Sequence, residues 1–257
     1  MVRDVLLVAA LVLLGSGCAS QTGSYSAKDP AQRFNQRSYA VSEGVDRVVL
    51  KPVARGYKRI VPGFLRTGIR NFFSNVRGVD SAVNGFLQGK PRRGFTDVGR
   101  VLVNTTLGIG GLFDPATEMG LKFQDEDFGQ TLAVWGYTES AYVYLPVVGP
   151  VTVRDLPVVA LRFVVPRFVL GENYTLGVGA LDVVALRSEA LTLTQARDAA
   201  ALDPYAFTRE AYYQRRRYQI FDGSPPQEEF FDEFEDEDFE EEPENTLESA
   251  LPEPSEL

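Results

Sequence analysis

The chain of 257 residues contains no histidine and a single cysteine, Cys18. The lack of histidine excludes Ser-His-Asp triads, Cys–His nucleophiles and histidine-ligated metals. A lone cysteine excludes a disulfide within the chain. Paired carboxylates could still support hydrolysis, but we interpret the acidic run at 125–127 as a helix N-terminus. No second convincing carboxylate pair occurs in the body, so the sequence favours a protein that is not an enzyme and that needs no cofactor or metal.

A phosphate-binding loop is missing as well. The glycine-rich string Gly108-Ile109-Gly110-Gly111 is followed by Leu112, Phe113 and Asp114-Pro115, without the lysine that such loops usually carry. We therefore expect a flexible or close-packed turn here instead of a nucleotide site.

Basic residues are absent from the C-terminal segment. Residues 221–257 contain 16 Asp and Glu, which leaves 26 basic and 19 acidic residues before them, a net charge of +7. A basic body suggests an anionic partner, either membrane phosphates or nucleic acid. Residues 224–257 are acidic, of low complexity and contain proline, so we predict a disordered tail. Its phenylalanines either dock on a partner or belong to a solvated, self-repelling segment.

No apolar run approaches the roughly 20 residues of a membrane-spanning helix. The first run, residues 5–14, follows Arg3 and is too short, so residues 1–17 are predicted to be a secretory signal peptide. The small residues 15–17 before Cys18 resemble a bacterial lipobox, which implies palmitate and other acyl chains on that cysteine; a buried free cysteine is the alternative. Ala19 favours sorting to the outer membrane, and residues 18–28 are predicted to be a lipidated tether.

The most apolar stretch, residues 142–170, is interrupted by four prolines and by charged residues. We interpret it as a re-entrant or interfacial segment packed in protein; buried strands are the alternative. Arg154 and Asp155 within it are expected either to form an internal pair or to flank an aqueous opening.

Residues 64–77 form the most informative helical pattern. One predicted face is apolar, an arginine stripe borders it, and asparagines lie roughly opposite. This pattern is typical of a helix in a membrane interface, with arginines reaching the phosphates; an ordinary amphipathic helix with solvated arginines is the alternative. The apolar and bordering residues that we assign to the membrane interface are Leu65, Arg66, Ile69, Arg70, Phe72, Phe73 and Val76.

Other helices are predicted at 30–50, 53–61, 96–107, 188–202 and 204–220, with separate segments at 78–87 and 176–186. Asp29-Pro30 and Asp203-Pro204 combine an N-cap with a first-turn proline. Aromatic residues beside Arg215-Arg216-Arg217 suit either single-stranded nucleic acid or the headgroup level of a membrane. For a secreted lipoprotein we favour the membrane and expect no nucleic-acid partner.

Several strings together resemble the MlaA (VacJ) family of outer-membrane lipoproteins, over about residues 29–223. They include Asp29-Pro30, Asn71-Phe72-Phe73, Asn84 with Leu87-Gln88-Gly89, Asn104-Thr105-Thr106, the strings at 108–114 and 126–132, Trp135-Gly136, Leu145-Pro146, Gly149-Pro150 and Thr152-Val153-Arg154-Asp155. The chain departs from the family at Ser140-Ala141-Tyr142, where Gly-Pro-Tyr is usual, and at Pro157-Val158, where a glycine is common.

The resemblance implies an all-α fold, a ring of amphipathic interfacial helices around a central channel. Such a ring would lie in the inner leaflet of the outer membrane of a Gram-negative bacterium, lipid-anchored on the periplasmic side. It implies maintenance of lipid asymmetry, with phospholipid removed from the outer leaflet and passed to an MlaC-type periplasmic carrier, in association with a trimeric porin. Candidate residues of the channel or lipid path are Asn71, Asn75, Gly129, Trp135 and Arg154.

Two other functions are alternatives to transport. An outer-membrane scaffold or interaction lipoprotein would act through the acidic tail at 224–257. A phospholipase would need a nucleophile and a base, and the sequence shows no such pair.

Overall fold

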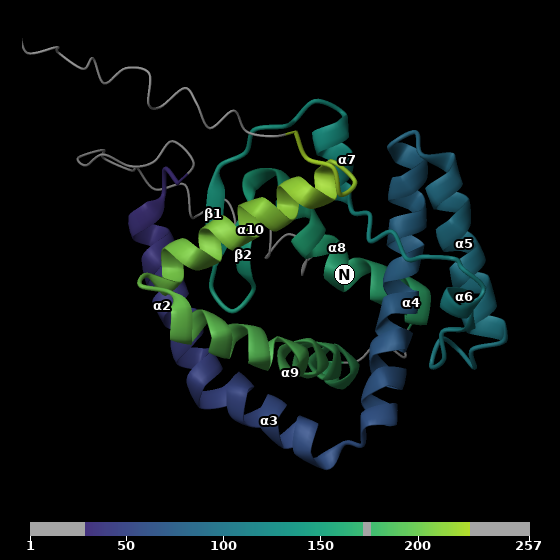
Figure 1. Ribbon diagram of the computed structural model, residues 1–257, viewed down its shortest axis with the longest axis horizontal. Helices are drawn as coiled ribbons and strands as arrows, with labels where there is room; N and C mark the ends of the chain where they lie inside the picture. Colours follow the sequence, from purple (N-terminus) through teal and green to yellow (C-terminus); the bar gives the residue numbers. More distant parts are fainter. Residues whose placement is uncertain (1–28, 172–175, 227–257) are drawn as a thin grey trace, which may run out of the picture.

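The computed structural model describes residues 29–171 and 176–226, most of which are helical. The helices form a ring-like frame (Figure 1). Helices α2 (Gln32–Val45) and α3 (Lys51–Ile60) make one side, α4 (Gly63–Leu87) the next, and α10 (Pro204–Ile220) lies opposite α3. The all-α prediction is confirmed, with a small hairpin added. The predicted signal peptide, Cys18, the tether and the acidic tail beyond residue 226 lie outside the described residues.

The first arm of the frame is a nearly continuous helix. A π-helical turn (Asp46–Leu50) joins α2 to α3, and Pro52 lies in the first turn of α3, where its missing N–H is tolerated. Asp29 is not the helix cap that we predicted. It is fully buried and accepts hydrogen bonds from Asn35 Nδ2 at 2.7 Å and from the Tyr205 hydroxyl at 2.5 Å, so this carboxylate joins the segment before α2 to α10.

Helix α4 continues through Gly78, so the expected boundary at that glycine is wrong. A Cβ atom on Gly78 would lie 2.9 Å from Val101 Cγ2 of α5 (Pro91–Thr106), and one on Gly85 would lie 2.9 Å from the Gly94 backbone nitrogen. Small residues therefore allow α4 and α5 to pack closely along their length. Helix α5 and the short α6 (Pro115–Glu118) lie on the outer side of α4 (Figure 1).

The acidic residues before α7 (Phe128–Val134) act as a helix N-terminus, as predicted. Asp127 is the N-cap, and its Oδ1 accepts a hydrogen bond from the Gln130 backbone N–H at 2.9 Å. Asp114 caps α6 in the same way, through the Thr117 backbone N–H.

The apolar stretch 142–170 divides into strands and a helix, where we expected a single kind of segment. Strands β1 (Tyr142–Leu145) and β2 (Gly149–Thr152) pair antiparallel, with Tyr142 opposite Thr152. A 3-10 turn (Val153–Asp155) leads into α8 (Leu156–Leu170), and Pro157 lies in the first turn of α8 where no helical N–H is required. The hairpin also makes the central part of the core.

Tyrosines dominate that core. Tyr142, Tyr144 and Tyr205 are buried, and Tyr39, Tyr212 and Tyr213 pack around them. The rings meet mostly edge to face, for example Tyr39 and Tyr144 with centroids 5.3 Å apart. Helix α10 has the predicted bounds, capped by Asp203, whereas α9 (Leu176–Ala200) is one helix where two segments were expected.

Candidate functional site

The arginine face of α4, formed by Arg66, Arg70 and Arg77, is directed toward α9. Arg77 Nη1 lies 3.3 Å from Asp182 Oδ1, and Arg70 Nη1 lies 3.5 Å from Glu189 Oε1. Arg66 lines a cavity between α3, α4 and α9. Figure 1 shows α9 inside the angle between α3 and α4, so these cations face the interior of the frame. The role of Arg66 and Arg70 as anchors to lipid phosphate stays a prediction, and Arg70 already has a carboxylate partner.

The asparagine face of α4 points the other way. Asn71 Nδ2 donates to the Leu112 carbonyl at 3.3 Å, and Asn75 Nδ2 donates to Thr105 Oγ1 at 2.9 Å. Both side chains therefore hold α4 against α5 and the loop after it. The structure does not bring them to the arginine face, so their proposed place on the lipid path has no support from this geometry.

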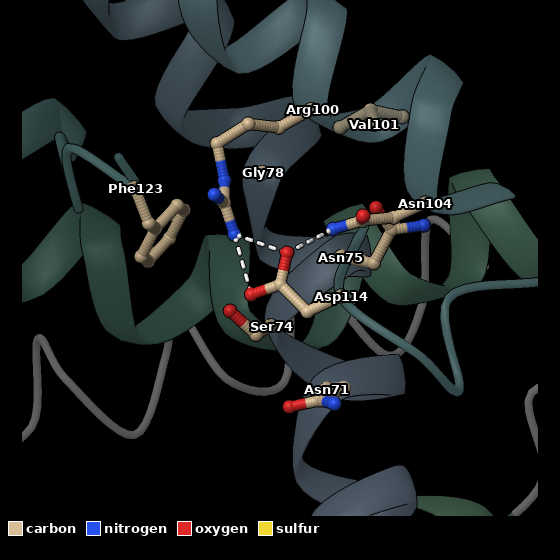
Figure 2. Close-up of a pocket in the computed structure, with 9 residues that line it drawn as sticks. All are labelled: Asn71, Ser74, Asn75, Gly78, Arg100, Val101, Asn104, Asp114 and Phe123. Atoms are coloured by element: carbon tan, nitrogen blue, oxygen red, sulfur yellow. Dashed lines mark hydrogen bonds and ion pairs between the residues drawn. The ribbon is translucent and has the colours of Figure 1, made fainter. Parts of the chain in front are cut away.

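Beside the asparagine face lies a small polar pocket (Figure 2). The Asp114 carboxylate is held by Arg100 Nη2, 3.0 Å from each of its oxygens, and by Asn104 Nδ2 at 2.9 Å. Burial alone would raise the pKa of Asp114, but hydrogen bonds from Thr117, Asn104 and Arg100 lower it below its usual value. The pocket measures about 10 Å³, room for roughly one water. We interpret it as the clamp that fixes loop 107–114.

The apolar face predicted for 64–77 is only partly on the surface. Leu65 is 48% exposed and Ile69 and Phe72 are half-buried, but Phe73 and Val76 are 3% and 4% exposed. The last two are therefore core residues, and their assignment to the membrane interface is corrected. They are buried because α4 packs against other helices along most of its length. The hydrophobic pattern of a single helix does not reveal these packing partners.

Another group of exposed apolar residues lies on α5 and the loop that follows. Phe95, Val98 and Leu102 occupy one face of α5 at helical spacing and are 69%, 37% and 60% exposed. Four large residues of the next loop are also exposed: Leu107, Ile109, Leu112 and Phe113. We call these seven residues the apolar stripe. Contiguous exposed apolar surface marks contact with a membrane or a partner.

Gly129 and Arg154 belong to a buried ion network. Arg216 binds the Asp127 carboxylate through both Nη atoms at 2.6 Å, and its Nε lies 2.8 Å from Asp155 Oδ2. Arg154 Nε lies 3.1 Å from Asp155 Oδ1, so the predicted internal pair is confirmed. Gly129 packs so closely on this network that a Cβ atom would overlap both Asp155 and Arg216.

This network joins the N-terminus of α7, the turn before α8, and α10. Burial raises the pKa of Asp155, but Arg216, a hydrogen bond from Tyr212 and the charge of Arg154 together hold it below its usual value. The carboxylate is thus ionised at neutral pH and fully engaged. The network has the character of a structural joint, and nothing in its geometry directs a charge toward a substrate.

Trp135 is the remaining candidate. Its side chain is 57% exposed, and its indole Nε1 donates to the Leu87 carbonyl at 3.0 Å. The indole therefore joins the end of α7 to the end of α4 and leaves an aromatic surface in contact with solvent.

No helix among the described residues is long and apolar enough to cross a membrane. Residues 29–171 and 176–226 also hold no group of acidic, cysteine or histidine side chains that could bind a metal.

Sequence reasoning missed the partners of the arginine face. Arg70 and Arg77 are seven residues apart, and so are Asp182 and Glu189. Seven residues are close to two helical turns, so each pair shares one side of its helix. The equal spacing of opposite charges was the signal that could have predicted antiparallel packing of α4 and α9.

Comparison with known proteins gives a consistent result. The family model described as MlaA lipoprotein matches residues 27–219. A protein of Haemophilus influenzae named intermembrane phospholipid transport system lipoprotein MlaA is 31% identical over 228 residues, which cover 84% of this chain and 89% of that protein. The protein of the same name from Escherichia coli K12 is 32% identical, covering 79% and 82% of the two chains.

A solved structure is also similar. It is described as the structural basis for maintenance of bacterial outer membrane lipid asymmetry, with a TM-score of 0.66 and 33% identity. The match covers 76% of this chain and 99% of the solved one. An uncharacterized protein of Rickettsia typhi is 32% identical over 208 residues, 80% of this chain and 83% of that protein.

Proposed function

The chain belongs to the MlaA lipoprotein family, and from this premise we propose that it maintains outer-membrane lipid asymmetry by retrograde phospholipid transport. Phospholipid leaves the outer leaflet, crosses the protein through a central channel and is delivered to a periplasmic carrier. The names of the relatives from Haemophilus and Escherichia, as phospholipid transport lipoproteins, support this role.

The observation that carries the proposal is the contrast between the two sides of α4. On its outer side lie α5 and the apolar stripe, with Phe95 and Phe113 more than half exposed. On its inner side the arginine face meets the carboxylates of α9. A lipid needs apolar surroundings for its tails and polar groups for its headgroup. One helix separating the two kinds of surface is suited to guide a molecule that has both.

We further propose that the apolar stripe, with Phe64, Leu65 and Phe72, is embedded in the inner leaflet. Phe64 is 74% exposed at the start of α4, so its side chain is available to acyl chains. Acyl chains on Cys18 would fix the protein to that leaflet. Arg66 and Arg70 would stand at the level of the headgroups.

The partners in this proposal are an MlaC-type carrier and a trimeric porin. Net direction comes from the higher affinity of the carrier for the lipid, because a channel lowers a barrier but does not set an equilibrium. The protein acts as a passage, and no bond of the lipid is broken.

The experiment that tests the proposal measures phospholipid on the cell surface, with an outer-leaflet lipid acyltransferase as reporter. Cells lacking the protein should show more acylated product, and wild type should restore the low level. A Cys18→Ala variant should fail to restore it, because the anchor is lost. Unchanged product in the deletion strain would contradict the transport function.

A variant that ends at residue 223 separates transport from a scaffold that acts through its acidic tail. The truncated protein should restore the low level of surface phospholipid nearly as well as wild type. Complete loss of restoration, with the protein still present in the membrane, would instead favour the scaffold.

A further inference from the structure

A cavity of about 80 Å³ lies where α3, α4 and α9 converge, and we call it the three-helix cavity. A single buried water needs only about 10–15 Å³ on the same scale, so this cavity has room for a group of several non-hydrogen atoms. It is on the inner side of α4, because α9 lies within the angle of α3 and α4 (Figure 1). The lining residues are Tyr57, Lys58, Arg66, Ala185, Ser188 and Glu189.

Two hydrogen-bond donors in this lining lack partners. Arg66 Nε and the Tyr57 hydroxyl are buried, and neither has a hydrogen-bond partner among the described residues. Ser188 is different, because its hydroxyl donates to the Ala185 carbonyl at 2.7 Å. Buried donors normally have acceptors. A ligand that presents acceptor oxygens would therefore satisfy both groups at once.

The charges of the lining residues indicate which chemical group would supply the acceptor oxygens. Lys58 and Arg66 contribute two cations, and Glu189 contributes one carboxylate. The ion pair between Glu189 and Arg70 is long, at 3.5 Å. Burial raises the pKa of Tyr57, with Arg66 lowering it and Glu189 raising it, so the hydroxyl keeps its proton at neutral pH and remains a donor. Two cations and two donors suit a phosphate group. The carboxylate would repel a simple anion but would attract an ammonium group.

We infer that the three-helix cavity binds the headgroup of a zwitterionic phospholipid, a phosphodiester that carries a primary ammonium group. The phosphate oxygens accept hydrogen bonds from Arg66 and Tyr57 beside the charge of Lys58, and the ammonium pairs with Glu189. The identification of the source as a lipid rests on the proposed function, because free phosphate offers the same oxygens. At this site the inner side of α4 holds the lipid headgroup during transport.

The test uses the full chain in dodecyl maltoside micelles and two soluble probes, glycerophosphoethanolamine and inorganic phosphate. The ³¹P NMR linewidth of each probe reports binding. Wild type should broaden the glycerophosphoethanolamine signal, and R66Q and Y57F should reduce the broadening at least threefold. E189Q should weaken binding of glycerophosphoethanolamine but leave binding of inorganic phosphate unchanged or stronger. The matched control is R59Q, which removes an exposed positive charge from α3 outside the lining and should behave as wild type.

Equal broadening of the glycerophosphoethanolamine signal by wild type and R66Q would overturn the inference. A loss of broadening in R59Q equal to that in R66Q would also overturn it, because it would indicate a general effect of charge. Tighter binding of inorganic phosphate than of glycerophosphoethanolamine in wild type would overturn the lipid source. Y57F removes only a hydroxyl, so it stays informative if R66Q fails to fold, as judged by circular dichroism. Cells with restored surface asymmetry but no probe binding in vitro would overturn the headgroup site alone, whereas an unchanged deletion strain would overturn the transport function.

Discussion

Arg187 of α9 forms a bidentate ion pair with Asp46 in the π-helical turn. Arg187 Nε lies 2.6 Å from Asp46 Oδ1, and Nη2 lies 2.7 Å from Oδ2. Both side chains are less than a fifth exposed. The pair fixes α9 against the arm formed by α2 and α3, and so it fixes one wall of the three-helix cavity.

We expect Arg187→Gln to lower the free energy of unfolding by about 2 kcal/mol, the usual scale for a hydrogen-bonded charged group that loses its partner. Urea unfolding followed by circular dichroism measures the change. Glu210→Gln is the control, because Glu210 is half exposed and its pair with Arg209 should contribute at most about 1 kcal/mol. A double mutant with Asp46→Asn should show coupling between the two sites; strict additivity would contradict the pairing.

Gly129→Ala and Gly56→Ala should have opposite effects on stability. A Cβ atom at Gly129 overlaps Asp155 and Arg216, while one at Gly56 in α3 meets no atom within 4 Å. Gly129→Ala should destabilise by about 3 kcal/mol or more through overpacking and a broken ion network. Gly56→Ala should stabilise by roughly 0.5–1 kcal/mol, because alanine loses less backbone entropy in a helix. Thermal unfolding distinguishes the two, and a shift of both melting temperatures in one direction would contradict the packing described.

Asp80 should make stability depend on pH between about 4 and 6. Burial, together with the charges of Asp127 and Asp125, raises its pKa to about 6, although a hydrogen bond from Asn84 lowers it. The folded state therefore binds this proton more tightly than the unfolded state does, and its contribution to stability falls as pH rises through that window. Asp80→Asn should flatten the dependence and should be the more stable protein at pH 7. The difference in urea midpoint between the two proteins, measured at pH 4.5 and 7, checks the sign.

The apolar stripe should govern association with vesicles once the acyl anchor is removed. In a Cys18→Ala background, Leu102→Ser and Phe113→Ser together should weaken binding to phospholipid vesicles at least tenfold, since each side chain loses roughly 1 kcal/mol of burial. Both residues are about 60% exposed, so the melting temperature should hardly change. Leu202→Ser, at a fully exposed leucine between α9 and α10, is the matched control. Loss of binding in that control equal to the double variant would refute the assignment.

The sequence was most informative where one residue pair defines a local structure. Asp203-Pro204 correctly predicted the start of α10 from an N-cap followed by a first-turn proline. The same pair at Asp29-Pro30 gave no cap, because the buried Asp29 carboxylate binds the Tyr205 hydroxyl instead. The hairpin at 142–152 was harder, since a short apolar run fits a strand or a buried helix equally well. Gly78 looked like a boundary, but here it admits α5, a packing partner that sequence alone does not identify.

The same limit applied to the candidate site. Helical periodicity placed Phe72 and Phe73 on one apolar face, yet only the packing of neighbouring helices decides that Phe73 is buried and Phe72 is not fully so. We therefore expect Phe73→Asp to unfold the protein, so this substitution cannot test whether α4 binds the membrane. Likewise, the sequence of α4 distinguishes an arginine face from an asparagine face. Which face lies on the inner side of the frame depends on α9, which is more than a hundred residues away in the sequence.

Trp135 gives the protein a natural optical label. It is the only tryptophan of the chain. Its hydrogen bond to the Leu87 carbonyl holds the indole at the junction of α4 and α7, while the residue stays 57% exposed. Emission excited at the red edge of indole absorption therefore comes from one known position. Quenchers dissolved in water or attached to acyl chains can locate that junction relative to a bilayer without any added dye.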